Sequence, residues 1–136
     1  MGKALAFDYG ARRTGIAITD ELQIIASALT TVETKTIWDF LDTLLEKESV
    51  SQFVVGDPSG LDGQETHNTK GANDFCKKLA KKYPDIPLDR IDESFSSKRA
   101  MEAMVAGGMK KKKRREKGNV DMVSAVIILQ DWLGQR

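Results

Sequence analysis

The chain has 136 residues, of which 40% are apolar and 30% are charged, and its formal net charge is +1. These values predict one globular domain over residues 1–136, with a buried core and little room for a second domain. No apolar run approaches the roughly 18 residues of a membrane-spanning helix and the N-terminal residues do not resemble a secretory signal, so we expect a cytoplasmic protein with no membrane partner.

The first part of the sequence predicts three sequential antiparallel strands. The stretch from Lys3 to Asp20 contains an apolar run that ends at Asp8, a glycine-containing turn, and a second run with alternating apolar residues. This order is typical of a β-hairpin. Residues 24–32 are apolar and β-branched, and they predict a third strand that completes a meander.

Asp8 is the first candidate site residue. Because side chains alternate along a strand, it lies on the same side as Ala4 and Ala6. These small neighbours leave room for an ion beside the carboxylate. A carboxylate next to a core strand needs a partner, and Arg12 or Arg13 in the following turn is the alternative to a metal ion.

Helices and strands alternate through the rest of the chain. Apolar residues one helical turn apart predict helices, and short apolar runs predict strands. Thr36 and Asn119 are the expected N-caps, and Cys76 is expected as a buried thiol that forms no internal disulfide. The strand before Glu93 is the least apolar and is expected near a sheet edge. The expected elements are a helix over residues 36–45, a strand over 52–56, a helix over 72–83, a strand over 87–92, and helices over 96–106 and 119–133.

The element order is therefore β-β-β-α-β-α-β-α-α, an α/β fold, and three acidic residues lie at element ends. Asp8 ends the first strand, Glu93 follows the fifth, and Asp121 is in the first turn of the last helix. Each has a simpler explanation: an arginine partner, water, or the helix dipole. Taken together they predict one metal site, because strand ends converge at a sheet edge and carboxylates suit Mg²⁺ or Mn²⁺. Two such ions about 4 Å apart activate water against a phosphodiester.

Basic residues are concentrated between the last two helices. Outside residues 110–117 the chain has 14 basic against 19 acidic residues, so its positive charge is local. Such a cluster attracts phosphate backbones by counterion release, although a solvated loop that binds nothing has the same composition. The cluster consists of Lys110, Lys111, Lys112, Lys113, Arg114, Arg115 and Lys117.

Other catalytic chemistries fit the sequence poorly. The single histidine, His67, excludes a zinc site made of Cys and His ligands. A Ser-His-Asp triad would have to use the same residue, and no Gly-x-Ser-x-Gly elbow is present. The glycine-rich segment after the fourth strand lacks the Gly-Lys-Ser/Thr ending of a P-loop, although Asp57 and Asp62 within it are weak additional ligand candidates.

Four segments, AFDYGARRTGIAITD, VVGDPSGLDG, DESFS and NVDMVSAVIILQDWL, resemble the blocks of the YqgF-type family in the RNase H-like superfamily. Members of this family are described as Holliday-junction resolvases and precursor ribosomal-RNA nucleases. The resemblance implies a five-stranded mixed sheet flanked by helices, with Asp8, Glu93 and Asp121 at the acidic active-site positions. It also implies a bacterial cytoplasmic nuclease that processes the 5′ end of pre-16S rRNA.

The chain departs from the family pattern at two positions. Ser94 stands where arginine is usual, and Asp57 stands where an apolar residue is more usual. Lys98 and Arg99, on the next helix, are candidates to replace the missing guanidinium, or are ordinary surface charges. With Arg12, Arg13 and the lysine cluster, they are the expected contacts to a nucleic-acid backbone.

Several alternatives stay open at this stage. The substrate is structured RNA or branched DNA, because backbone contacts carry no base information. The protein acts as a monomer or as a homodimer. A non-catalytic nucleic-acid-binding or ribosome-assembly module has the same fold, and a phosphate-handling domain of the actin and sugar-kinase type has a similar first hairpin.

Overall fold

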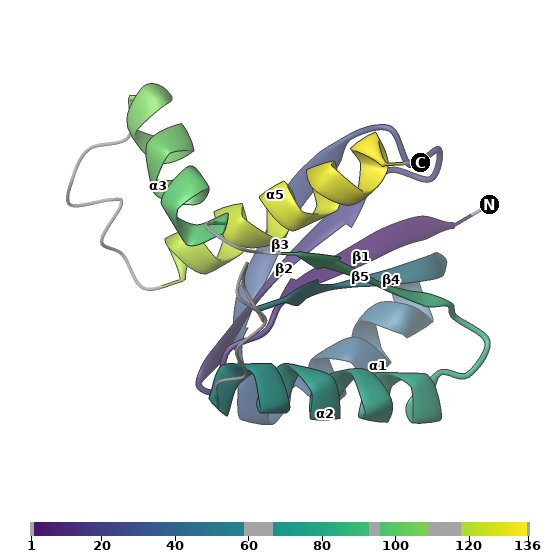
Figure 1. Ribbon diagram of the computed structural model, residues 1–136. Coiled ribbons are helices and arrows are strands. Elements are labelled where there is room, and N and C mark those ends of the chain that lie inside the picture. The colour runs from purple at the N-terminus through teal and green to yellow at the C-terminus, as the bar shows by residue number, and fades with distance from the viewer. Residues whose placement is uncertain (1, 59–66, 93–95, 109–117, 136) are drawn as a thin grey trace.

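The computed structural model describes residues 2–58, 67–92, 96–108 and 118–135 (Figure 1). The strands are β1 (Lys3–Asp8), β2 (Arg13–Thr19), β3 (Ala26–Glu33), β4 (Val50–Asp57) and β5 (Leu88–Asp92). The helices are the short 3₁₀ turn η1 (Thr34–Thr36), α1 (Ile37–Lys47), α2 (His67–Lys82), α3 (Ser96–Ala106) and α5 (Asn119–Gly134). No helix within these ranges is long and apolar enough to cross a membrane.

The strands form one five-stranded mixed sheet in the order β3-β2-β1-β4-β5. β1, β2 and β3 pair in antiparallel fashion, as the meander prediction requires. β4 is parallel to β1, and β5 is parallel to β4. The C-terminal ends of β1, β4 and β5 therefore meet at one edge of the sheet, which we call the active edge, and the predicted outer position of β5 is confirmed.

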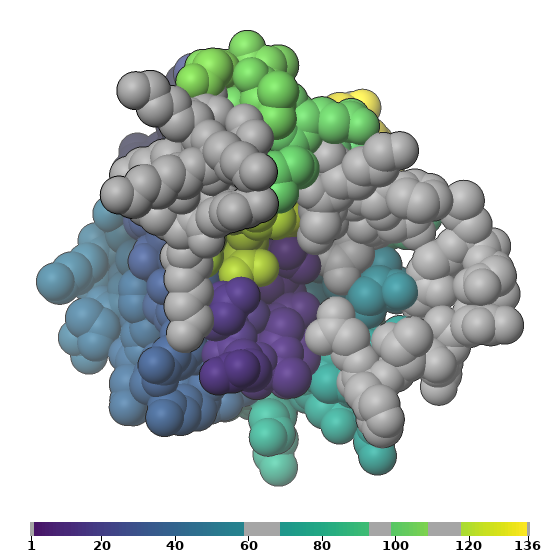
Figure 2. Space-filling model, turned by 90° about the vertical axis from the view of Figure 1, so that its left-hand side faces the viewer, coloured from purple at the N-terminus to yellow at the C-terminus, as the bar shows by residue number. Residues whose placement is uncertain are grey.

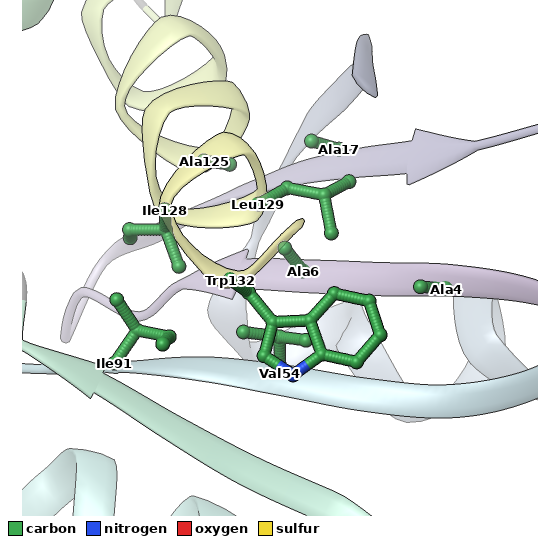
Figure 3. Close-up of a cluster of buried hydrophobic side chains, with 9 residues drawn as sticks. All are labelled: Ala4, Ala6, Ala17, Val54, Ile91, Ala125, Ile128, Leu129 and Trp132. Atoms are coloured by element: carbon green, nitrogen blue, oxygen red, sulfur yellow. The ribbon is translucent and has the colours of Figure 1, made fainter. Parts of the chain in front are cut away.

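Helices cover both faces of the sheet, with α5 and α3 on one side and α1 and α2 on the other (Figure 1). The alternation of β1 explains the two layers, since Leu5 and Phe7 join the core under α1 and α2. Ala4 and Ala6 face α5, which lies close to the sheet because these side chains are small (Figure 3). The cluster under α5 consists of Ala4, Ala6, Ala17, Val54, Ile91, Ala125, Ile128, Leu129 and Trp132.

The third strand begins two residues later than the sequence predicts. Asp20 directly follows β2, and its carboxylate accepts hydrogen bonds from the backbone N–H groups of Leu22, Ile24 and Ile25, at 3.2, 2.9 and 2.8 Å. These bonds hold the chain in a turn, so the strand starts at Ala26. Side-chain hydrogen bonding to nearby backbone competes with strand pairing in this way.

Smaller differences concern the helix ends and the cysteine. Gly118, with φ 95°, is the N-cap of α5, so Asn119 is its first residue and not its cap. Thr36 is the N-cap of α1 as predicted, but its hydroxyl donates to the carbonyl oxygen of Glu33 and does not cap the helix. Cys76 is half-buried, and this burial raises the pKa of its thiol.

The turn at Asp20 leads to a prediction about acid stability. Hydrogen bonds from Ile25 and Ile24 lower the pKa of the Asp20 carboxyl below its ordinary value of 3.8. The carboxylate therefore stabilises the fold above that value, and its contribution is lost as the pH falls through the lowered folded-state pKa. We expect urea unfolding of the wild type and Asp20→Asn to differ at pH 6 and to converge toward pH 2. Asp85→Asn, at an exposed loop position, is the control, and an unchanged difference across this range would contradict the prediction.

Candidate active site

Asp8 lies at the C-terminal end of β1, at the active edge. Its partner in the antiparallel ladder with β2 is Gly15, and paired residues of this kind lie about 5 Å apart. Ala4 and Ala6, which precede Asp8 at intervals of two residues, both lie under α5. Strand alternation therefore directs the half-buried side chain of Asp8 toward the helix that carries Asp121.

Asp121 reaches the same place because Gly15 has no side chain. A Cβ atom built on Gly15 would lie 2.0 Å from the carbonyl oxygen of Asp121 and 2.3 Å from its carbonyl carbon. The first turn of α5 thus rests directly on the strand position that pairs with Asp8. Figure 2 looks onto this edge and shows the start of α5, in yellow-green, against the N-terminal segment, in purple. The end of β1 and the first turn of α5, which are far apart in the sequence, therefore meet at this edge.

Arg13 forms an ion pair with the second of these carboxylates. Its Nε donates to Oδ2 of Asp121 at 3.2 Å, and the two side chains are 37% and 27% exposed. From the sequence, Arg12 or Arg13 was the alternative to a metal ion beside Asp8; in the structure Arg13 pairs with Asp121, 108 residues away. An ion pair this exposed contributes little stability, so its main effect is to orient the carboxylate.

The third predicted acid, Glu93, lies outside the described residues. β5 ends directly before it at Asp92, whose ladder partner is Asp57 at the end of β4. Alternation directs both of these aspartates toward α2, because Arg90, two residues before Asp92, donates to Asn73 of that helix at 3.0 Å. Asp57 therefore lies at the active edge but on the face opposite to Asp8, so it does not add a ligand to this site.

A divalent metal ion is held by several side-chain ligands that lie close together. Within the described ranges, no group of three or more His, Cys, Asp or Glu side chains is close enough to hold a metal. A ligand set of three such side chains would therefore include a residue from outside these ranges. Oxygen-only ligands of this type suit Mg²⁺ and Mn²⁺ and do not suit softer metals.

The predicted basic contacts have different positions. Arg12, in the exposed turn after β1, and Arg13 line a hollow of about 450 Å³ beside the active edge. Arg99 forms a two-pronged ion pair with Asp131 of α5, at 2.9 and 3.1 Å, which also raises the pKa of its guanidinium. Arg99 therefore links α3 to α5. The side chain of Lys98 and the cluster at residues 110–117 are outside the described part, as is Asp62.

Sequence reasoning overlooked two contributors. Gly15 permits the approach of α5, and the signal for it was a lone glycine inside a strand pattern, which often marks close backbone contact. Lys35 lines the same hollow as Arg12, but an isolated exposed lysine has no recognisable motif.

The chain matches known proteins over almost its whole length. The RuvX family model, described as Holliday junction resolvase, matches residues 2–135. A protein of Phocaeicola vulgatus is 49% identical over 133 residues, and one of Christiangramia forsetii is 47% identical over 133 residues. The alignments cover 98% of this chain and 96% and 98% of those proteins, and both carry the name "Putative pre-16S rRNA nuclease".

Solved structures agree with the expected fold class. RuvC of T. thermophilus, in complex with a Holliday junction substrate, aligns with a TM-score of 0.58 over 100% of this chain and 96% of that one, at 16% identity. A second T. thermophilus RuvC structure gives a TM-score of 0.52 at 15% identity. At these identities the likeness shows the RNase H-like fold alone, whereas the sequence match shows kinship. The chain belongs to the RuvX family, the YqgF-type proteins that its sequence blocks resemble.

Proposed function

We propose that the chain works as a single-domain, divalent-metal-dependent nuclease that hydrolyses phosphodiester bonds in structured nucleic acid. Its proposed role is to process the 5′ end of pre-16S rRNA in the cytoplasm. The observation that carries this proposal is the contact of the Asp121 backbone with Gly15, the ladder partner of Asp8, which supports a shared site for these two acids at one sheet edge. The names of its relatives favour the same chemistry.

The carboxylates are proposed to hold the ion. Asp8 and Asp121 supply two ligands, and Glu93, which follows the strand that ends at the same edge, supplies the third. Mg²⁺ or Mn²⁺ held by these residues would supply activation of a water molecule and stabilisation of the leaving oxygen of a phosphodiester. The protein's own part is to keep the acids adjacent, and Arg13 contributes by orienting Asp121 through their hydrogen bond.

The basic residues are proposed to hold the substrate backbone. Arg12 is exposed beside the active edge, and Lys98 follows the start of α3. Gly118, directly after the lysine cluster, accepts a hydrogen bond from the hydroxyl of Thr31 on β3 at 2.7 Å. This contact fixes the position of Gly118, three residues before Asp121, and it supports a role for the cluster next to the acids. Lysines there would raise affinity for any phosphate backbone and make it salt-dependent.

A second candidate function is resolution of branched DNA. The family description names Holliday junctions, and the structural neighbour was solved on one. Symmetric cutting of two strands requires a homodimer, whereas trimming one RNA end requires only a monomer. A non-catalytic assembly module is the third candidate.

Metal removal separates these functions. We expect purified protein with Mg²⁺ or Mn²⁺ to shorten a labelled pre-16S 5′-flank RNA, to lose this activity in excess EDTA, and to regain it when the ion is restored. A four-way DNA junction is assayed in parallel. Cleavage of the junction alone would favour the resolvase, and cleavage that survives EDTA would contradict the metal site. Binding of both nucleic acids without cleavage would identify the non-catalytic module.

A further inference from the structure

Two hollows lie side by side next to the active edge. The first, of about 450 Å³, is lined by Arg12, Arg13 and Lys35 together with one side of β3. The second, of about 370 Å³, lies between the start of α1 and α2 and is lined by Tyr9 and Trp38 among others. Ala11 and Lys35 line both hollows, so the two adjoin each other. We call them together the side groove.

We propose that the side groove binds a single-stranded stretch of the substrate next to the cleavage point. The phosphates lie beside Arg12 and Lys35 in the first hollow, and a base lies against Tyr9 and Trp38 in the second. The inference rests on the proposed nuclease function and deepens it, because it names a substrate class: nucleic acid in which a paired region meets an unpaired strand.

Charge in the groove favours a polyanion. Arg12 and Lys35 are exposed in the first hollow, and Lys78 of α2 is exposed in the second. Two carboxylates oppose them: Glu33, which lies 3.5 Å from the amine of Lys35, and Asp74 of α2. Arg13 also lines the groove, so basic side chains outnumber acidic ones among the lining residues. The positive potential of such a hollow is concentrated and attracts a polyanion.

The aromatic side chains in the second hollow are held in place. The ring of Tyr9 stacks on Phe75 with centroids 5.2 Å apart, and the ring of Trp38 lies 5.4 Å from the same phenylalanine. A Cβ atom at Gly71 would lie 2.8 Å from Cε1 of Tyr9. Glycine inside a helix is unfavourable, so its presence in α2 is explained by the room that the Tyr9 ring needs. The rings form a fixed platform that begins one residue after Asp8.

A fixed aromatic platform beside cations selects unpaired bases. A base within a duplex is stacked on both faces and is not available to a side chain, whereas an unpaired base stacks on Tyr or Trp regardless of sequence. The volume of the second hollow falls within the range of small-molecule sites, which accommodates one nucleotide. The groove is lined by residues adjacent to the acids, Tyr9 next to Asp8 and Arg13 bonded to Asp121, and so suits a strand that leaves the paired region.

The test measures binding of short single strands to Asp8→Asn protein, so that cleavage does not interfere. Fluorescence anisotropy is followed with labelled RNA and DNA hexamers across a salt series. We expect the double variant Lys35→Ala/Lys78→Ala to bind about tenfold more weakly, and its salt slope to fall by about 0.7 for each lost phosphate contact. Lys47→Ala, an exposed lysine at the far end of α1, is the matched control and should bind as the parent does.

A second variant tests the platform separately. Trp38→Leu should weaken binding of base-bearing hexamers about tenfold and leave binding of an abasic hexamer unchanged. The melting temperature of this variant is measured first, because Trp38 is half-buried. If the variant does not fold, the Lys35→Ala/Lys78→Ala variant, changed at exposed positions, tests the side groove alone. Binding of either the RNA or the DNA hexamer supports the inference and identifies the strand.

The outcome is distinguishable from failure of the nuclease proposal. Unchanged affinity in the Lys35→Ala/Lys78→Ala variant overturns the side groove even if wild-type protein cleaves its substrate. Weakened binding in that variant supports the groove even if no cleavage is found with any metal.

Discussion

Asp8→Asn is expected to lower the rate of cleavage by more than 100-fold while leaving the fold and nucleic-acid binding intact. The substitution removes the negative charge and keeps the shape of the side chain. Loss of a group that supports a metal ligand typically costs about 10–100-fold, so loss of a ligand itself should cost more. Asp8 is half-buried at a strand end, where an amide of equal size is readily accommodated, and the melting temperature should stay within a few degrees.

The measurement is single-turnover cleavage with Mn²⁺, with affinity measured in parallel. Asp92→Asn is the matched control, because this aspartate ends β5 at the same edge but is directed toward α2. It should cleave at close to the wild-type rate. Full activity in Asp8→Asn would remove Asp8 from the mechanism, and an equal loss in both variants would mean that overall charge at the edge, not a specific ligand, is what matters.

The order of strands and helices could be predicted from the sequence, because the buried apolar residues recur with the spacing of a strand or of a helix. In β1 the alternation separates Leu5 and Phe7 from Ala4 and Ala6, and the structure buries these pairs under different helices. The last helix, predicted over residues 119–133, forms as Asn119–Gly134 and lies along the sheet. Such a pattern is predictable because the spacing of apolar residues along the sequence reflects which side chains are buried.

The hydrogen-bond partners of the side chains could not be predicted from the sequence, because they depend on how distant elements pack against each other. Arg12 and Arg13 were the alternative to a metal ion as partners of Asp8, and Arg13 donates its hydrogen bond to Asp121, 108 residues away. Arg99 was a candidate contact to a nucleic-acid backbone or an ordinary surface charge, and in the structure it pairs with Asp131 of α5. Both partners lie on the helix that crosses the sheet, and the angle of that crossing is a property of the packed core, which no local pattern specifies.

The approach of α5 to the sheet depends on one glycine, and Gly15→Ala is expected to destabilise the protein strongly. The new methyl group would lie 2.0 Å from the carbonyl oxygen of Asp121 and 2.9 Å from the amide nitrogen of Met122. Both atoms belong to the backbone, so no rotation of a side chain relieves the clash and the first turn of α5 has to move. Overpacking of this kind costs about 1–3 kcal/mol, and a clash with backbone belongs at the upper end.

The same displacement should reduce cleavage beyond what unfolding explains, because it moves Asp121 away from Asp8. Urea unfolding gives the loss of stability, and single-turnover cleavage well below the melting temperature gives the activity of the folded fraction. Gly134→Ala, near the other end of α5, meets nothing within 4 Å and should change stability by no more than about 0.5 kcal/mol. If Gly15→Ala were as stable and active as that control, the first turn of α5 would not rest on β2, and the two carboxylates would have no reason to share an ion.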